Sequence, residues 1–333
     1  MDLGKLSITL PAPFVDARGA AALARRADEE WGYDAIWLAE TNAQESFSLA
    51  GALAALTTRV EIGTAIVPVF NRTPAILAMG AGTLAQLSAG RFILGVGSSS
   101  HAIIDGWNGI DFERPLTRVR EAVTVLRQAL GGQKTDFQGE TLRSRGFRLG
   151  APPPGPQRVY LAALRSKMLE LAGEIGDGLI INFQPVTAMK PILEAYARGG
   201  QRAGRDVSDH EVVSRFQVCV TDDPASARNL VRMAFGGYVA APVYNKFFEW
   251  VGFEDVARGV REAFARGDRA GTAAAISDEF VDAVAIIGSA DECREKLAAF
   301  VAAGVTTPVI SPLATGPGAA EAMFEALAPG RRG

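Results

Sequence analysis

Short apolar segments alternate with longer amphipathic ones along the chain. Eight of the short segments are rich in aliphatic residues, and most are almost continuously apolar instead of alternating with polar residues. Continuous apolar runs of this length are typical of parallel strands that are covered on both faces. The predicted strands span residues 6–10, 35–39, 60–67, 91–96, 158–164, 178–183, 211–220 and 304–310.

The segments between these strands have the periodicity and the end signals of helices. Thr73 and Pro74 provide an N-cap and a first turn, Ser289 precedes an acidic first turn, and Gly90 and Gly304 stand at helix ends. Eight successive strand and helix units are characteristic of the α/β class and build a closed barrel. The sequence therefore predicts a (β/α)8 TIM barrel.

Two regions interrupt the alternation and are predicted to be insertions. Residues 135–157, after the region of the fourth strand, have the pattern of a hairpin closed near Gln138 to Glu140 and followed by a proline-rich connection. Residues 236–288 are predicted to form extra helices between the seventh and eighth strands. Because no repeat or linker divides the chain, we expect one domain over residues 1–333.

Composition and charge narrow the range of partners. A chain of 333 residues with 48% hydrophobic residues can bury a large core. The net charge is −3 and the basic residues are scattered, so neither nucleic acid nor an anionic membrane surface is an expected partner. The start lacks a signal-peptide pattern and no run of about 18 apolar residues occurs. We expect a cytoplasmic protein that binds a small molecule.

Cysteine and histidine are too few for a metal cage or a disulfide framework. Cys219 and Cys293 are far apart in the sequence, and His101 and His210 are the only histidines. No metal site is expected.

Residues 90–101, "GRFILGVGSSSH", pair an apolar run with closely spaced glycines. A dinucleotide-binding loop would place a third glycine where Ser100 stands, and a helix should begin where further glycines and a proline follow. We therefore interpret the stretch as the fourth barrel strand and its loop. Gly95 and Gly97 would thin the barrel wall so that a flat ligand can approach the backbone.

Five segments in order resemble the luciferase-like superfamily of TIM barrels. Within it they are similar to the oxidoreductases that use the deazaflavin coenzyme F420, including the methylenetetrahydromethanopterin reductase-like group. The segments are residues 33–40, 59–100, 114–130, 159–183 and 286–310. The resemblance implies that F420 is the cofactor, that it carries a hydride to or from a small organic substrate, and that the chain forms a homodimer.

The resemblance also implies which residues bind the coenzyme. A non-proline cis peptide between Ala65 and Ile66 would support one face of the ring system, although the same residues could form an ordinary strand ending at Pro68. Gly97, Ser98 and Ser100 would contact the ring edge.

The phosphate of the coenzyme would bind the backbone N–H groups of Ala163, Leu164 and Arg165 at a helix start. Many relatives have glycine where Leu164 or Arg165 stands. Asn182 would bind the ring or the tail, or else cap its strand.

Glu40 and His101 are the predicted catalytic residues. Each follows a barrel strand, at the end where barrel active sites lie, and each could exchange a proton with the substrate. Glu40 could instead be a solvated loop acid or pair with Arg72, and His101 could be structural. In the glucose-6-phosphate dehydrogenase of the family an acidic residue stands in the place of Ser100, so that acid has no counterpart here.

Two other functions stay open from the sequence. An FMN-dependent luciferase-like monooxygenase would consume oxygen, and a catalytically silent relative would bind F420 without turnover. The aromatic-rich segment 237–253 could form a substrate wall or simply pack against the barrel. A reduced pterin, an alcohol, a sugar derivative and an imine all remain open as substrates.

Overall fold

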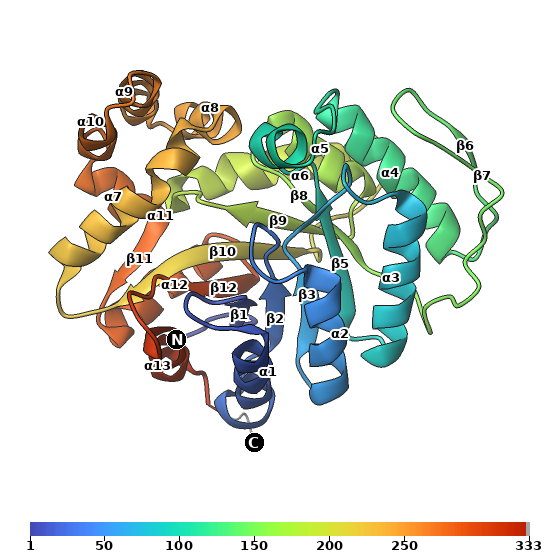
Figure 1. The fold of residues 1–333 in the computed structure, drawn as a ribbon, viewed down its shortest axis with the longest axis horizontal. Helices are drawn as coiled ribbons and strands as arrows, with labels where there is room; N and C mark the ends of the chain where they lie inside the picture. The colour runs from blue at the N-terminus through green and yellow to red at the C-terminus, as the bar shows by residue number, and fades with distance from the viewer. Residues whose placement is uncertain (331–333) are drawn as a thin grey trace.

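Eight parallel strands close into a barrel in the computed structural model, which describes residues 1–330 (Figure 1). Each strand pairs with the next around the ring, and the last pairs with the first, since Ser7 lies beside Val309. This confirms the predicted TIM barrel. The barrel strands are β1 Ser7–Leu10, β2 Ala35–Leu38, β3 Glu61–Thr64, β5 Phe92–Gly97, β8 Val159–Ala162, β9 Gly178–Asn182, β10 Glu211–Val220 and β12 Thr307–Pro312.

Helices cover the outside of the barrel, and several begin at the predicted caps. The Thr73 hydroxyl accepts the N–H of Ile76, and Ser289 forms a capping box with Glu292. The covering helices are α1 Ala17–Arg26, η1 Ala27–Trp31, α2 Ser46–Leu56, α3 Pro74–Leu87, α4 Pro115–Leu130, α5 Ser166–Ile175, η3 Val186–Ala188, α6 Met189–Arg202, α12 Ala290–Ala302 and α13 Ala319–Leu327. No helix within residues 1–330 is long and apolar enough to cross a bilayer.

The first predicted insertion is an antiparallel hairpin of β6 Asp136–Gln138 and β7 Arg143–Arg145. It projects beside α4 at the edge of the molecule (Figure 1). The buried Glu121 of α4 accepts the N–H groups of Glu140 and Leu142 at 2.6 and 3.1 Å, which fixes the turn to the barrel.

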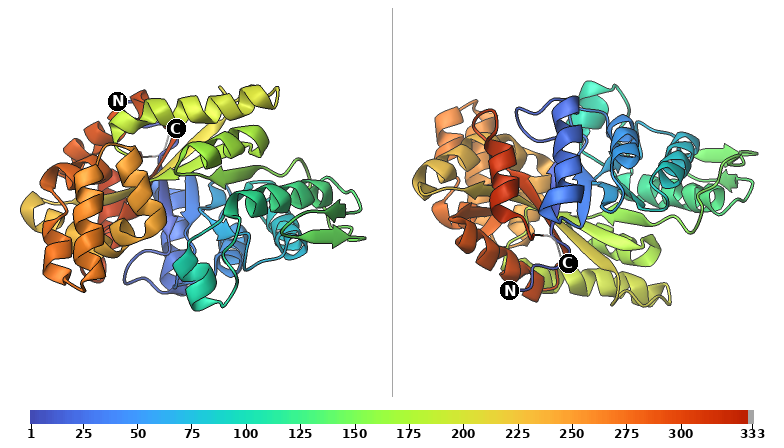
Figure 2. Two further views of the ribbon diagram at one scale, coloured as in Figure 1. Left: turned by 90° about the horizontal axis from the view of Figure 1, so that it is seen from above. Right: turned by 90° about the horizontal axis from the view of Figure 1, so that it is seen from below.

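The second insertion gathers on one side of the barrel (Figure 2). It contains α7 Pro224–Ala240, α8 Pro242–Trp250, α9 Glu254–Ala265, α10 Arg269–Ala274 and α11 Asp278–Val284. The prediction of helices alone was wrong, because the segment ends in a strand, β11 Ala285–Gly288. Strand β10 extends beyond its pairing with β9, and its end from Gln217 to Val220 pairs with β11.

Side chains fill the interior of the barrel near the N-terminal ends of the strands, its lower end. A ligand site must therefore lie at the opposite end, which we call the mouth. Trp37 and Tyr160 stack inside with ring centroids 6.0 Å apart, next to aliphatic residues of the other strands. The Tyr160 hydroxyl donates to Glu211 at 2.6 Å near the lower end. The C-terminal ends of the strands are therefore the open end of the barrel.

The third predicted strand is interrupted at its C-terminal end. The peptide bond between Ala65 and Ile66 is cis, and the chain resumes as β4 Val67–Pro68 beside the end of β5. The single strand predicted over residues 60–67 is thus two short strands, β3 and β4, which flank the positions predicted to support a cofactor ring.

Candidate functional site

Ile66, Gly97 and Ala162 lie side by side at the barrel mouth. A Cβ atom on Gly97 would stand 3.2 Å from both Ile66 Cδ1 and Ala162 Cβ. Glycine at residue 97 therefore leaves the backbone of β5 uncovered between these two side chains, as the approach of a flat ligand would require.

Glycine is required at residue 95 for a different reason from the one predicted. A Cβ atom at this position would lie 1.8 Å from the carbonyl oxygen of Thr64. The Thr64 hydroxyl also exchanges hydrogen bonds with the backbone of Gly95 at 2.8 and 2.9 Å. The neighbouring strand, and no ligand, requires glycine at residue 95.

The loop after β5 turns sharply into a short helix. Ser99 has a positive φ of 63°, and the Ser98 hydroxyl donates to the Ser99 carbonyl at 3.3 Å. The Ser100 hydroxyl accepts the N–H of Ile103 at 3.4 Å at the start of the π-helix η2 Ala102–Trp107. The expectation that no helix begins here was therefore wrong, because η2 forms in this loop despite Gly106.

His101 stands on this loop and faces solvent. Its side chain is 70% exposed, and Nε2 lies 3.0 Å from a carboxylate oxygen of Asp105. The imidazole ring also meets the edge of Phe112, with centroids 6.2 Å apart. His101 is thus accessible and paired with an acid, an arrangement in which it can receive or give a proton.

Glu40 is held in an ion pair with Arg72, the alternative to its catalytic role. Arg72 donates to both oxygens of Glu40, and the N–H of Ser46 donates to Oε2 at 3.0 Å. Both side chains are only 13% exposed. Both carboxylate oxygens of Glu40 are therefore engaged within the protein, which leaves this side chain little freedom to contact a substrate.

Arg72 also binds Glu45, the N-cap of α2. Burial lowers the pKa of Arg72, but the hydrogen bonds and charges of Glu40 and Glu45 outweigh burial and raise it. For the acidic Glu45, burial has the opposite effect and raises the pKa. The hydrogen bonds from Ser48, from the Phe47 N–H group and from Arg72 outweigh burial and lower the pKa of Glu45 to about 2. The three side chains form one charged cluster that joins the loops after β2 and β4.

The loop after β8 leads directly into the N-terminus of α5. The N–H of Ala163 donates to the carbonyl of Ile180 at 3.0 Å. Ala163 therefore cannot offer its N–H to a phosphate, and that part of the prediction was wrong. Arg165 is an exposed N-cap residue, Leu164 packs against a neighbouring apolar cluster, and the first N–H groups of α5 are directed toward the mouth.

Asn182, at the end of β9, has unused hydrogen-bonding capacity. Its side chain lies close to the Tyr244 hydroxyl, while Oδ1 is buried with no hydrogen-bond partner within residues 1–330. Burial raises the pKa of Tyr244 to about 12, so the phenol stays protonated at neutral pH. Asn182 can therefore accept a hydrogen bond from a ligand at the mouth.

The aromatic segment 237–253 mainly packs into the protein. Phe247 and Phe248 are each 1% exposed within an apolar cluster. Phe183 lies in the middle of the nearby rings, 5.6 Å from Tyr244 between centroids. Packing thus explains most of these rings, and Tyr244 is the one that meets Asn182.

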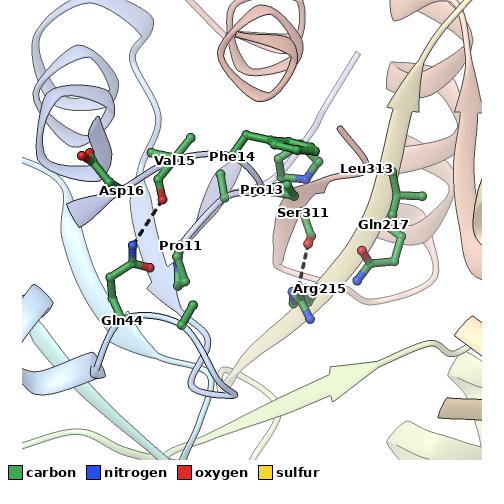
Figure 3. A pocket seen from close by; sticks show the side chains of 13 residues that line it. Pro11, Pro13, Phe14, Val15, Asp16, Gln44, Arg215, Gln217, Ser311 and Leu313 are labelled. Carbon is green, nitrogen blue, oxygen red and sulfur yellow. Dashed lines mark hydrogen bonds between the residues drawn. The ribbon is translucent and has the colours of Figure 1, made fainter. Parts of the chain in front are cut away.

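A cavity opens at the mouth on the side of β1, β10 and β12, and sequence reasoning missed it (Figure 3). Its volume is about 640 Å³, and its polar lining comes from Asp16, Gln44, Arg215, Gln217 and Ser311. The polar alternation of Arg215 and Gln217 within the apolar segment 211–220 was a signal that could have revealed it.

No cluster of three or more His, Cys, Asp or Glu side chains suited to a metal ion occurs in the described part of the chain.

Comparison with known proteins places the chain in a family. A family model described as luciferase-like monooxygenase matches residues 4–307, and the chain belongs to this family. It is 32% identical over 286 residues to a 5,10-methylenetetrahydromethanopterin reductase of Archaeoglobus fulgidus, covering 84% of this chain and 86% of the relative.

Two further proteins are similar over most of their length. One, from Mycobacterium tuberculosis, has the provisional name coenzyme F420-dependent oxidoreductase and is 33% identical over 86% of this chain and 88% of its own. The other is the solved F420-dependent tetrahydromethanopterin reductase of Methanopyrus kandleri. It has a TM-score of 0.82 and 23% identity, with 98% of this chain and 97% of that chain covered.

Proposed function

We propose that this protein is an F420-dependent oxidoreductase that transfers a hydride between coenzyme F420 and a small organic substrate. Its sequence similarity to a methylenetetrahydromethanopterin reductase and to an F420-dependent oxidoreductase supports an oxidoreductase of this kind. The single observation on which we rely most is the close packing of Ile66, Gly97 and Ala162, where a Cβ atom at residue 97 would stand 3.2 Å from both neighbours.

The residues at the mouth fit a flat, polar ring system with an anionic tail. In this proposal Ala65 and Ile66 support one ring face, and Gly97, Ser98 and Ser100 lie along the ring edge. The buried and unpartnered Oδ1 of Asn182 accepts a hydrogen bond from the coenzyme. Bound F420 supplies the hydride chemistry, while the chain binds, orients and manages the proton.

The tail is proposed to bind at the start of α5. The free N–H groups of the first turn and the positive end of the helix attract an anion. Arg165 and Lys167 add positive charge beside them, and Leu164 fixes the loop by packing. The N–H of Ala163 is already bonded to the Ile180 carbonyl within the barrel. The residues that follow Ala163 therefore bind the anionic tail in this proposal.

We assign proton exchange with the substrate to His101 in preference to Glu40. The His101 ring is exposed beside Asp105, whereas both oxygens of Glu40 accept hydrogen bonds. Glu40 then acts as a positioning residue, because with Arg72 it holds together the loops that border the ring site.

Two alternatives each have one observation in their favour. The family model is described as a monooxygenase, which favours FMN and oxygen. The engagement of Glu40 by Arg72 favours a protein that binds F420 without turnover.

An anaerobic assay separates these functions. Purified protein is mixed with reduced F420 and a panel of acceptors that includes methylenetetrahydromethanopterin, and the return of oxidised F420 absorbance is followed. In a separate aerobic assay, oxygen uptake is measured with reduced FMN and an oxygenase substrate panel, and the spontaneous uptake by reduced FMN without protein is subtracted. Oxidation of F420 that depends on an acceptor supports the proposal, whereas oxygen uptake with reduced FMN and no F420 oxidation would overturn it.

A further inference from the structure

The cavity beside β10 contains an arginine that has no acidic partner among residues 1–330. Arg215 Nη2 donates to Ser311 Oγ at 2.8 Å, and its Nε is buried without a partner (Figure 3). The ionisable side chains that act on Arg215 are Tyr238 and Tyr244, and neither is a carboxylate. A buried guanidinium remains charged and is costly unless an anion compensates it.

Arg215 faces the interior of the barrel mouth. It lies beside Asn182 of β9 in the strand register, and Gln217, two residues further, lies beside Ser311 of β12. Alternate residues of a strand point to one face, so Arg215 and Gln217 project together. Strands β10 and β12 lie apart from β3, β4, β5 and β8, which form the proposed support for the ring and the tail, and β9 with Asn182 stands between the two groups.

The remaining walls of the cavity are mainly apolar, apart from Asp16 and from Gln44, whose Nε2 donates to the Val15 carbonyl at 3.2 Å. Pro11, Pro13 and Phe14 follow β1 on one side, and Leu313 follows β12 on the other (Figure 3). Asp16 also borders the cavity, where its Oδ1 caps α1 by accepting the N–H of Gly19 at 2.7 Å. One guanidinium with a carboxylate at the rim suits a single negative charge better than the double charge of a phosphate.

We propose that Arg215 binds a carboxylate of the substrate, with Gln217 and Ser311 completing the site. The inference rests on the proposed function, since it names the substrate class of that oxidoreductase. The planar fork of arginine matches the two oxygens of a carboxylate. The apolar body of the substrate lies against Phe14 and Leu313, and its reactive carbon is directed across the mouth toward the ring site.

Benzoate is a suitable probe, because it joins one carboxylate to an apolar ring. Its binding to the protein without coenzyme is measured by calorimetry at constant ionic strength, with benzamide and phenyl phosphate as comparison ligands. The variants are R215Q, S311A, which removes the bond that orients the guanidinium, and R143Q as a matched control on the exposed β7 strand.

We expect R215Q to weaken benzoate binding by about tenfold or more, S311A to weaken it less, and R143Q to leave it unchanged. Benzamide should bind no better to wild type than benzoate binds to R215Q. Equal benzoate binding in wild type and R215Q, or tighter binding of phenyl phosphate than of benzoate, would overturn the inference.

Titration of the same variants with F420 distinguishes the two possible sources of the carboxylate. Unchanged F420 affinity in R215Q supports a substrate site. An F420 affinity that falls as far as the benzoate affinity would overturn the inference, because Arg215 would then bind acidic groups of the coenzyme. Failure of the wild type to bind F420 would refute the proposed function instead, since the benzoate measurement contains no coenzyme.

Discussion

Replacement of Arg72 by methionine tests whether the charged cluster at the mouth is structural. The substitution keeps much of the apolar stem and leaves Glu40 and Glu45 close together without their cation. Removing one partner of a buried pair costs about 3–5 kcal/mol. Glu40 and Arg72 are nearly buried, but Glu45 is about half exposed, so solvent screens its share. We expect a loss of about 3 kcal/mol near pH 7.

The loss of unfolding free energy caused by R72M should be smaller in acid. The direction of this pH dependence follows from the pKa of Glu45. Its pKa is about 2 in the folded protein and 4.5 in its ordinary state. A lowered folded pKa contributes stability above about pH 4.5, and that contribution disappears as the pH falls toward 2. Because Arg72 is one of the groups that lower this pKa, wild type should lose more stability in acid than R72M.

Urea denaturation at about pH 7 and about pH 3.5 measures both effects. Arg143→Met, a substitution of an exposed arginine on β7, is the matched control and should change the unfolding free energy by no more than about 0.5 kcal/mol. A loss in R72M as small as in this control, or a loss that is equal at both pH values, would refute the reasoning.

Three further substitutions test the fold, the ring site and proton exchange. Asp28→Ala removes the carboxylate that accepts the N–H groups of Thr58, Arg59 and Val60 at 2.7–2.9 Å. Urea denaturation should show an unfolding free energy lower by about 3 kcal/mol. A loss below about 1 kcal/mol would contradict this. Gly97→Val should weaken F420 binding by about tenfold or more in a fluorescence titration, because the added methyl groups meet Ile66 and Ala162, whereas Gly106→Ala enters open space and should bind normally. His101→Ala should retain F420 binding and the melting temperature, but its rate of hydride transfer between F420 and the active substrate should fall about 100-fold or more; an unchanged rate would remove His101 from the scheme.

Apolar continuity was enough to predict the eight barrel strands, because both faces of a parallel strand are buried in this fold. The same reasoning missed the place of Arg215 in the cavity, because a charged residue within an apolar run was treated as part of an ordinary buried strand. Strand β11 was also missed, because its pairing depends on how far β10 extends beyond β9. A register of this kind is a tertiary property and has no local signal.

Individual contacts at the mouth could not be predicted from residue type. Thr64 explains Gly95, and the carbonyl of Ile180 takes the N–H of Ala163. Each contact joins residues on different strands, so sequence spacing does not reveal it. The pairing of Glu40 with Arg72 was one of three roles open from the sequence, and the structure shows that pairing.

Titration of the purified apo-protein with oxidised F420 and, separately, with FMN tests the central claim most directly. Cofactor fluorescence reports binding in both cases and requires no knowledge of the substrate. We predict micromolar binding of F420 and much weaker binding of FMN. Tight binding of FMN with weak binding of F420 would contradict the account and would assign the protein to the oxygen-using branch of its family.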